Sequence, residues 1–422
     1  MKKNIISIDT IILFLATLSV IKFVPAEIRL VVHPIVIFLL GIYLLIDVML
    51  NARENNISYL NTCKFIIIIL IISLLAIIPC LHRISQRHNG NPYEFAHDGG
   101  VIQTEEAIKY FIKGENPYHE DYYNTILDEH YTVYKLDEIK NSLIHHYTYL
   151  PLTFLFPIPF YFLSKATIGW FDMRFIYILM FGLSLYTIPK LAIDFRSKAL
   201  LLITISLNPF FTYFLADGRN EIFLLFWLLM SFLFLMRDRL KTASVFLGLA
   251  CVSKPTAWFL IPFFITYIWG KNNESENLGK KLMFLLKNTY PFILIFLIFI
   301  LPFLILDFHS FKEDIFNWDE AYPLGGTPGY GFSNLLLFIG YSKSDYFPFK
   351  YLQLITGLPL LYFLLRRQLK NNTINFMLIS YGILSFVLLY FSRFLHDNYL
   401  GYVFSVLCLG FFLEERKGYL IH

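Results

Sequence analysis

Long apolar stretches alternate with short polar segments along most of the chain. One of them, residues 65–78, contains a single polar side chain, Ser73. A helix needs about 20 predominantly apolar residues to cross the hydrocarbon core of a bilayer. The stretches fall near residues 8–24, 29–49, 64–81, 148–164, 171–189, 199–216, 219–236, 241–253, 256–270, 289–306, 347–365, 373–391 and 398–413. This pattern predicts an all-α polytopic membrane protein.

The stretch at 148–164 differs from the others because it contains Pro151, Pro157 and Pro159. Proline lacks a backbone donor and clashes with the preceding turn, so it breaks the helical hydrogen-bond ladder. Irregular backbone persists at membrane depth only where protein covers it or where it lines a cavity. We therefore expect a broken, re-entrant segment here and about twelve transmembrane helices in the rest of the chain.

The distribution of Lys and Arg predicts which side of the membrane each loop faces. With the N-terminus inside, the inside segments contain 19 basic and 7 acidic residues, whereas the rest of the chain contains 16 and 24. These inside segments are 1–7, 50–64, 190–198, 237–241, 271–288, 366–370 and 414–422. The bias predicts that the two long loops, 82–147 and 307–346, face outside. The alternative is that 190–198 faces outside despite its three basic residues.

Composition agrees with a membrane protein and excludes a soluble enzyme. Of the 422 residues, 57% are hydrophobic and 16% are charged, and a soluble domain of this size needs far more polar surface. The net charge of +4 is too small to indicate a nucleic-acid partner. The four cysteines have no metal-binding spacing and are interpreted as packed thiols.

The chain divides into two N-terminal transmembrane helices (1–63), a larger membrane module with both outer loops (64–413) and a cytoplasmic tail (414–422). The N-terminus, Met1-Lys2-Lys3 followed by an apolar run, has no small-residue cleavage site. We therefore interpret it as a retained first span and not as a signal peptide.

The first outer loop contains an acid followed by a short amphipathic pattern. Apolar residues recur at helical spacing from Val101 to Ile112, and Gly114 follows as a stop signal. The pattern predicts a helix that lies on the outer membrane surface. Asp98, just before its first turn, is either the N-cap of this helix or an acid held at the membrane–water boundary, and the two interpretations are compatible.

Polar residues also lie at the predicted outer ends of other stretches. Adjacent histidines are a weak metal signal, so His146, beside His145, is expected to make hydrogen bonds or contact a phosphate. Arg219 has Asp217 and Glu221 beside it for a local ion pair. Lys254 stands between two apolar runs, where its amine either extends to the headgroups or binds a lipid phosphate.

Two further outer segments are candidates for substrate contact. Residues 319–332 contain several glycines and tyrosines, a composition that suits stacking against sugar faces or an ordinary structured loop. Arg393, His396 and Asp397 stand close together at the outer end of the penultimate span. An acid that acts as a base and several cations that hold a leaving phosphate are therefore predicted on one face. The residues of this face are Asp98, Arg219, Glu221, Lys254, Arg393, His396 and Asp397.

The sequence resembles the GT-C superfamily of membrane glycosyltransferases, and within it the bacterial mannosyltransferase-like enzymes that use polyprenyl-phosphate sugars. The resemblance extends over about residues 64–413, although each matching piece is short. It rests on Asp98, 114–118, 149–152, Asn208-Pro209, 218–221 and 396–399. Unlike many relatives, this chain has two predicted spans before the one that leads into the acidic loop.

The resemblance implies an inverting transfer of a hexose, with mannose as the expected sugar, from a polyprenyl-phosphate carrier to a glycan or lipid acceptor. It implies no metal and no cofactor. Asp98 would be the general base, with assistance from His396. Basic residues such as Lys254 and Arg393 would hold the carrier phosphate. The remaining candidates for substrate or phosphate binding are Arg219, Glu221, Asp397 and His146. The expected location is a bacterial inner membrane, with the lipid bilayer as a partner.

Two other functions remain open at this stage. A polytopic transporter or a flippase for lipid-linked glycans would also use a broken helix such as 148–164. Against it, few ionisable residues lie deep within the predicted spans, where coupled transporters carry them. A glycan polymerase or ligase that acts on a carrier-linked polymer would need the same outer acids and cations.

Overall fold

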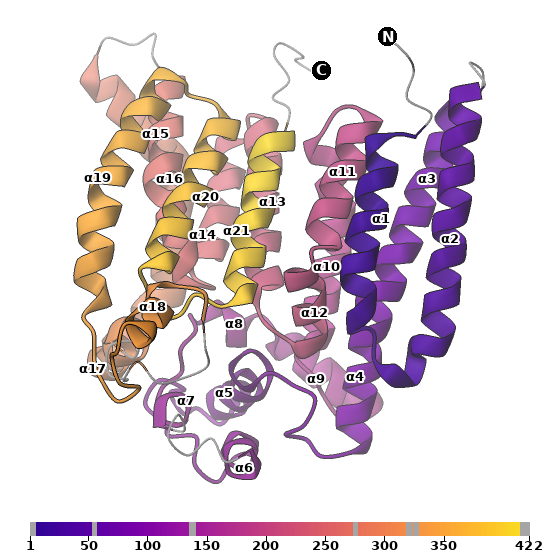
Figure 1. Cartoon of the computed structure of the whole chain (residues 1–422). Helices are drawn as coiled ribbons and strands as arrows, with labels where there is room; N and C mark the ends of the chain where they lie inside the picture. The colour runs from indigo at the N-terminus through magenta and orange to yellow at the C-terminus, as the bar shows by residue number, and fades with distance from the viewer. Residues whose placement is uncertain are drawn as a thin grey trace.

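The computed structural model describes residues 6–52, 57–134, 141–272, 277–317, 324 and 329–413. These residues form helices and turns and contain no strand, which confirms the prediction of an all-α fold. Most of the long helices lie side by side in one bundle (Figure 1). The first helix begins and the last helix ends at the same end of this bundle, and the short helices of the two long loops lie at the opposite end.

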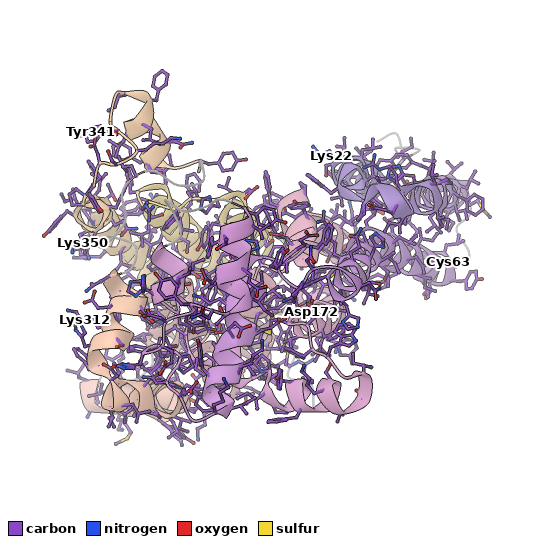
Figure 2. All side chains as sticks on the ribbon, turned by 90° about the horizontal axis from the view of Figure 1, so that it is seen from below. Lys22, Cys63, Asp172, Lys312, Tyr341 and Lys350 are labelled. Carbon is purple, nitrogen blue, oxygen red and sulfur yellow. The ribbon has the colours of Figure 1, made fainter. Side chains whose placement is uncertain are left out.

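Three helical segments form the N-terminal side of the bundle. They are α1 (Ile8–Val20), α2 (Ala26–Ala52) and the continuous run of α3 (Ile57–Ile72), η2 (Ser73–Ile77) and α4 (Ile78–Asn89). Pro79 lacks the N–H that an α-helix requires, and the helix widens into the π-helical turn η2 just before it. Seen from the loop-bearing end, Lys22 and Cys63 lie to one side of the bundle, whereas Asp172 lies near its middle (Figure 2).

The first long loop and the proline-rich stretch that follows it contain short helices. They are η3 (Asp98–Gln103), α5 (Thr104–Ile112), α6 (Ile126–Val133), α7 (Asn141–His145), α8 (Leu152–Leu155) and α9 (Ile158–Ile168). The predicted helix after Asp98 is confirmed as η3 and α5, and Gly114 follows it with φ at +86°. Its N-cap is His97, and Asp98 is its first residue.

The apolar side of this helix packs against protein and not, as predicted, against the membrane surface. All residues from Gly99 to Ile108 are buried against the rest of the protein. The apolar positions that suggested a lipid-facing stripe instead fill the space between the loop and the bundle. The proline-rich stretch 148–164 is broken at Pro157 into α8 and α9, which lie at the loop-bearing end (Figure 1).

The central helices follow the first loop. They are α10 (Arg174–Thr187), η4 (Ile188–Leu191), α11 (Phe195–Ser206), α12 (Pro209–Asp217), α13 (Glu221–Met236), α14 (Leu240–Cys251), η5 (Pro255–Leu260) and α15 (Ile261–Lys271). The axes of α11 and α12 differ by 50°. Asn208-Pro209 causes this break, because Pro209 starts α12 and the Asn208 side chain accepts a hydrogen bond from the N–H of Phe210.

The C-terminal part contains the remaining helices. They are α16 (Leu278–Leu306), α17 (Phe308–Lys312), η6 (Glu313–Asn317), α18 (Phe332–Phe338), α19 (Phe349–Lys370), α20 (Ile374–Tyr390) and α21 (Asp397–Phe412). Small residues allow close packing of α20 against α21, since a Cβ at Gly410 would lie 2.8 Å from the Ile379 side chain. The predicted tail 414–422 lies outside the described residues.

Four helices are long and apolar enough to cross a membrane. They are Ala26–Met49, Ser58–Asn89, Arg174–Leu191 and Leu278–Leu306, and the bent pair α11 and α12 makes a fifth if it counts as one span. Most of the other apolar stretches form shorter helices such as α13 and α14, whereas α19 has 22 residues but is not apolar enough. A membrane location is supported, whereas the twelve predicted spans outnumber the four or five segments that are long and apolar enough.

Candidate functional site

Segments from four parts of the chain meet at the loop-bearing end of the bundle. The backbone N–H of His97 donates to the Asp217 carbonyl at 2.8 Å. The side chain of Arg219 donates to Asn398 at 2.9 Å, and Lys254 donates to Glu221 at 2.5 Å. We call this group the outer cluster: His97, Asp98, Asp217, Arg219, Asn220, Glu221, Lys254, His396, Asp397 and Asn398.

The first loop approaches the turn between α12 and α13 so closely that only glycine fits. A Cβ at Gly100 would lie 2.2 Å from the carbonyl oxygen of Gly218. Gly218 itself ends α12 with φ at +94°, a conformation that glycine adopts without strain. Together with the bond from His97 to Asp217, these glycines hold the segment of His97 and Asp98 against the turn that carries Arg219 and Glu221.

Asp98 is a partly accessible carboxylate of the outer cluster, since its side chain is 26% exposed, and Asp217 is similar at 28%. Its Oδ1 accepts the N–H of Gly99 at 2.7 Å, and its Oδ2 accepts the hydroxyl of Tyr131 at 2.8 Å. Burial raises the pKa of Asp98, but His97 and these two hydrogen bonds outweigh it, so the pKa lies below its usual value. At neutral pH the carboxylate is therefore ionised and able to accept a proton.

Glu221 and Lys254 form a buried ion pair. Glu221 Oε1 accepts hydrogen bonds from Lys254 at 2.5 Å and from Asn398 at 2.7 Å. Lys254 also donates to Asn220 at 2.9 Å, and its ammonium lies 4.8 Å from the centre of the Tyr399 ring. The partner of Lys254 is thus a carboxylate of the protein, and its side chain does not extend to the headgroups. Glu221 Oε2 is buried and accepts no hydrogen bond from the part of the chain that the structure describes.

Arg219 is the more exposed cation of the outer cluster. Its Nε donates to Asp217 at 3.3 Å, and its guanidinium lies 4.3 Å from the centre of the Phe214 ring. A small hollow of about 10 Å³ adjoins Arg219 and Glu221, and its other walls are apolar side chains of α12 and α13. The Arg219 guanidinium therefore lies beside a surface of apolar side chains.

The segment before α21 joins the outer cluster to the second long loop. Burial and the nearby Arg219 lower the pKa of His396 to about 4, so its ring is neutral at physiological pH. Arg393 also lowers this pKa and stacks on Phe394. The backbone carbonyl of Arg393 accepts a hydrogen bond from the Ser333 hydroxyl at 2.8 Å. Asp397 raises the pKa of Arg219, which agrees with its predicted place on the same face.

His146 lies elsewhere. Its Nδ1 is 2.6 Å from Asp314 Oδ1, and Asp314 Oδ2 accepts the N–H of Tyr147 at 2.8 Å. This contact joins the first loop to the second. The predicted sugar-stacking strip 319–332 lies largely outside the described residues.

A buried ionic network supports the outer cluster from behind. Arg174 is fully buried and donates hydrogen bonds to the carbonyls of Phe95 at 2.6 Å and Ala216 at 3.0 Å. In the sequence, Phe95 shortly precedes Asp98, and Ala216 immediately precedes Asp217. Arg174 also pairs with Asp172 at 2.7 Å. Sequence reasoning missed Arg174 and Tyr131. The available signal was a charged pair, Asp172 and Arg174, at the edge of the apolar stretch 171–189.

No group of three or more His, Cys, Asp or Glu side chains in the described ranges has the geometry to hold a metal ion. The outer cluster offers instead an ionised acid, cations and amides. No known protein-family profile matches the chain, and no characterised protein is similar enough in sequence to be identified as a relative.

Proposed function

We propose that this protein is an integral-membrane glycosyltransferase of the GT-C type, which moves a hexose from a polyprenyl-phosphate carrier to a glycan or lipid acceptor at the loop-bearing face. One observation carries the proposal. Asp98 is ionised and partly exposed, and its neighbour His97 is bonded to Asp217, the ion-pair partner of the cation Arg219. Mannose is the sugar that the resemblance favours.

In the proposed step, an acceptor hydroxyl attacks the anomeric carbon of the carrier-linked sugar. Asp98 takes the hydroxyl proton, the bond between the anomeric carbon and the phosphate oxygen breaks, and the sugar is transferred with inversion. The leaving group is the carrier phosphate, which needs a cation to stabilise its charge.

Arg219 is the best placed residue to receive that phosphate. Its guanidinium adjoins the apolar wall formed by Phe210 and Phe214, which suits a charged head attached to a prenyl chain. Lys254 is already bonded to Glu221 and Asn220, so it contributes to the positive field and holds Glu221 in place. His396, neutral at physiological pH, is available to donate a hydrogen bond to the acceptor or the phosphate.

We further propose that the bundle crosses the membrane twelve times, in a bacterial inner membrane, with the loop-bearing end outside. The common end at which α1 begins and α21 ends supports an even number of crossings. The excess of Lys and Arg on that side supports a cytoplasmic location for it.

A transporter or flippase is the second candidate, and two observations favour it. The α11–α12 break is a discontinuous helix, and such helices build transporter sites. Lys64 also forms a fully buried ion pair with Asp9 and Asp47, which is the kind of group that coupled transporters use.

The test uses the purified full chain in lipid with radiolabelled polyprenyl-phosphate mannose and a membrane extract as the acceptor source. Wild type is compared with Asp98→Asn and with Asp121→Asn, a control that removes an exposed carboxylate from the same loop. We expect transfer by wild type and by Asp121→Asn, and a loss of about 10²–10⁴-fold in Asp98→Asn. Full activity of Asp98→Asn would refute its role as base. Movement of substrate across the membrane without a glycosylated product would favour the transporter.

A further inference from the structure

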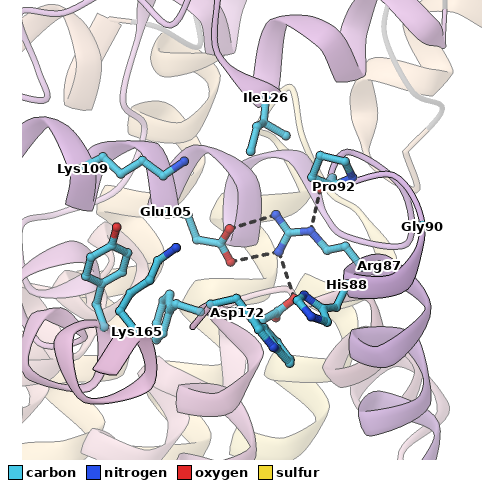
Figure 3. Close-up of a pocket in the computed structure, with 12 residues that line it drawn as sticks. Arg87, His88, Gly90, Pro92, Glu105, Lys109, Ile126, Lys165 and Asp172 are labelled. Carbon is cyan, nitrogen blue, oxygen red and sulfur yellow. Dashed lines mark hydrogen bonds and ion pairs between the residues drawn. The ribbon is translucent and has the colours of Figure 1, made fainter. Parts of the chain in front are cut away.

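A pocket of about 210 Å³ lies outside the outer cluster, where the end of α4 meets α5, α6 and α9 (Figure 3). One wall is Arg87, which donates to both oxygens of Glu105 at 3.0 and 2.9 Å and to Asp172 at 2.9 Å. Its Nε donates to the carbonyl of Pro92 at 2.6 Å. The charge of Arg87 is therefore neutralised within the protein, and its side chain forms a fixed wall of the pocket.

Two lysines reach into the pocket from different helices. Lys109 extends from α5 and Lys165 from α9, and their ammonium groups end on the same side of Glu105 (Figure 3). Lys109 donates one hydrogen bond to Glu106 at 2.7 Å, and an ammonium has two further N–H donors. Lys165 is exposed, and no carboxylate of the described residues forms an ion pair with it.

The side chains in and around the pocket carry a net positive charge. Glu105 and Asp172 are balanced by Arg87 and Arg174, and Lys109 by Glu106. The charge of Lys165 remains. A compact anion with several acceptor oxygens satisfies two converging ammonium groups, and phosphate is the common biological group of this kind. The volume is below the roughly 300 Å³ of pockets that hold drug-sized ligands, so it suits a headgroup.

The neighbouring surface indicates that the anion belongs to a lipid. Phe162, Leu163 and Ile168 of α9 are exposed, and no residue of this helix is buried. Tyr161 and Trp170 flank the pocket, and Trp170 stacks on His88 with the ring centres 3.9 Å apart. Tyr and Trp beside exposed apolar side chains are typical of the membrane–water interface. A bilayer that covers these exposed apolar side chains would place its lipid phosphates at the level of the pocket.

We propose that this pocket binds the phosphodiester headgroup of an anionic lipid through Lys109 and Lys165. The inference does not depend on glycosyl transfer, because none of these residues belongs to the outer cluster. Lipid bound here contacts α5 and α9, the helices that follow Asp98 and the proline break, and so tethers the first loop to the bilayer surface.

The test is native mass spectrometry of the full chain in detergent, titrated with phosphatidylglycerol or phosphatidylcholine of the same acyl chains. Lys109→Ala/Lys165→Ala is compared with Lys113→Ala/Lys312→Ala, which removes two exposed lysines near the same face but outside the pocket. Lysines at a membrane surface contribute about fivefold each to the binding of anionic lipid, so we expect roughly 30-fold weaker binding of phosphatidylglycerol by the pocket variant. Binding of phosphatidylcholine should not change, and Lys109→Arg/Lys165→Arg should restore most of the affinity.

Three results would overturn the proposal. An unchanged affinity in the pocket variant would show that the lysines bind no headgroup. An equal loss in the control variant would assign the effect to general surface charge. Binding of soluble glycerol phosphate to wild type as tight as that of the lipid, and lost in the pocket variant, would show that the phosphate comes from solution and not from the bilayer. Thermal unfolding of each variant checks that the fold is intact.

Discussion

Lys254 donates a hydrogen bond to Glu221 at 2.5 Å, although 33 residues separate them in the sequence. Both side chains are nearly inaccessible to solvent. A buried charge without its partner is far more costly than a buried pair. The pair therefore fixes the segment before η5 against the start of α13, and it does so beside Arg219 and Asn398.

Removal of one member of this pair should destabilise the protein more than removal of both. Lys254→Met leaves the Glu221 carboxylate buried without its cation, and we expect a loss of about 3–5 kcal/mol. Lys254→Met/Glu221→Gln should recover part of it. Thermal unfolding of the purified chain measures the effect. The control is Lys271→Met, which removes an exposed ion pair with Asp238 and should cost at most about 1 kcal/mol. Additive losses in the double variant would contradict this interpretation.

Tyr131 should control the pH dependence of transfer through Asp98. Its hydroxyl stabilises the ionised carboxylate at 2.8 Å, so Tyr131→Phe should raise the pKa of Asp98. On acidification, the transfer rate of this variant would then begin to fall about one pH unit higher than that of wild type. The pH profile of sugar transfer is the measurement. Tyr134→Phe, an exposed neighbour, should leave the profile unchanged, and an unshifted profile in Tyr131→Phe would exclude this role.

Local sequence signals were sufficient for several features of the fold. Gly114 ends the helix that follows Asp98, and Pro157 breaks the stretch 148–164. Polar residues at the ends of apolar stretches predicted the face on which Arg219, Glu221 and Lys254 meet. Such features depend on residues close in sequence, or on the rule that loops between spans alternate sides.

Contacts between distant segments could not be predicted in this way. The bonds from Arg174 to the carbonyls of Phe95 and Ala216 depend on the packing of three separate segments, and no motif marks them. The same holds for Tyr131, which reaches Asp98 from α6. Burial of α5 was also missed, because an amphipathic helix has the same pattern whether its apolar side meets lipid or protein.

The buried ion pairs of Lys64 should hold the N-terminal helices together. Its ammonium lies 2.6 Å from Asp9 and 2.9 Å from Asp47, and the Tyr43 hydroxyl donates to Asp9 at 2.6 Å. Lys64→Met leaves two buried carboxylates without their cation, so we expect a loss of about 3–5 kcal/mol in thermal unfolding experiments. Lys22→Met, which changes an exposed lysine just beyond the other end of α1, should have little effect. Equal stability of the two variants would refute the role of Lys64.

Contact between the two long loops should strengthen as the pH falls. Burial raises the pKa of Asp314 to about 6, although hydrogen bonds from His146 and Tyr147 lower it in part. With the loops apart, the carboxyl would return to its usual pKa near 3.9. The docked state therefore binds the proton more tightly. Its extra stability is fully present below about pH 4 and is lost as the pH rises through about 6.

Hydrogen exchange of residues 143–149 measures this contact, after correction for the intrinsic dependence of exchange on pH. We expect greater protection at pH 5.5 than at pH 7.5 in wild type. Asp314→Asn should remove the difference, because its neutral amide does not titrate. A second pair also joins the loops, since the hydrogen bond to Asp307 raises the pKa of His119. His119→Gln removes that titration and should retain the wild-type difference. Equal protection at both pH values in wild type, or loss of the difference in His119→Gln instead of Asp314→Asn, would assign the pH response to a group other than Asp314.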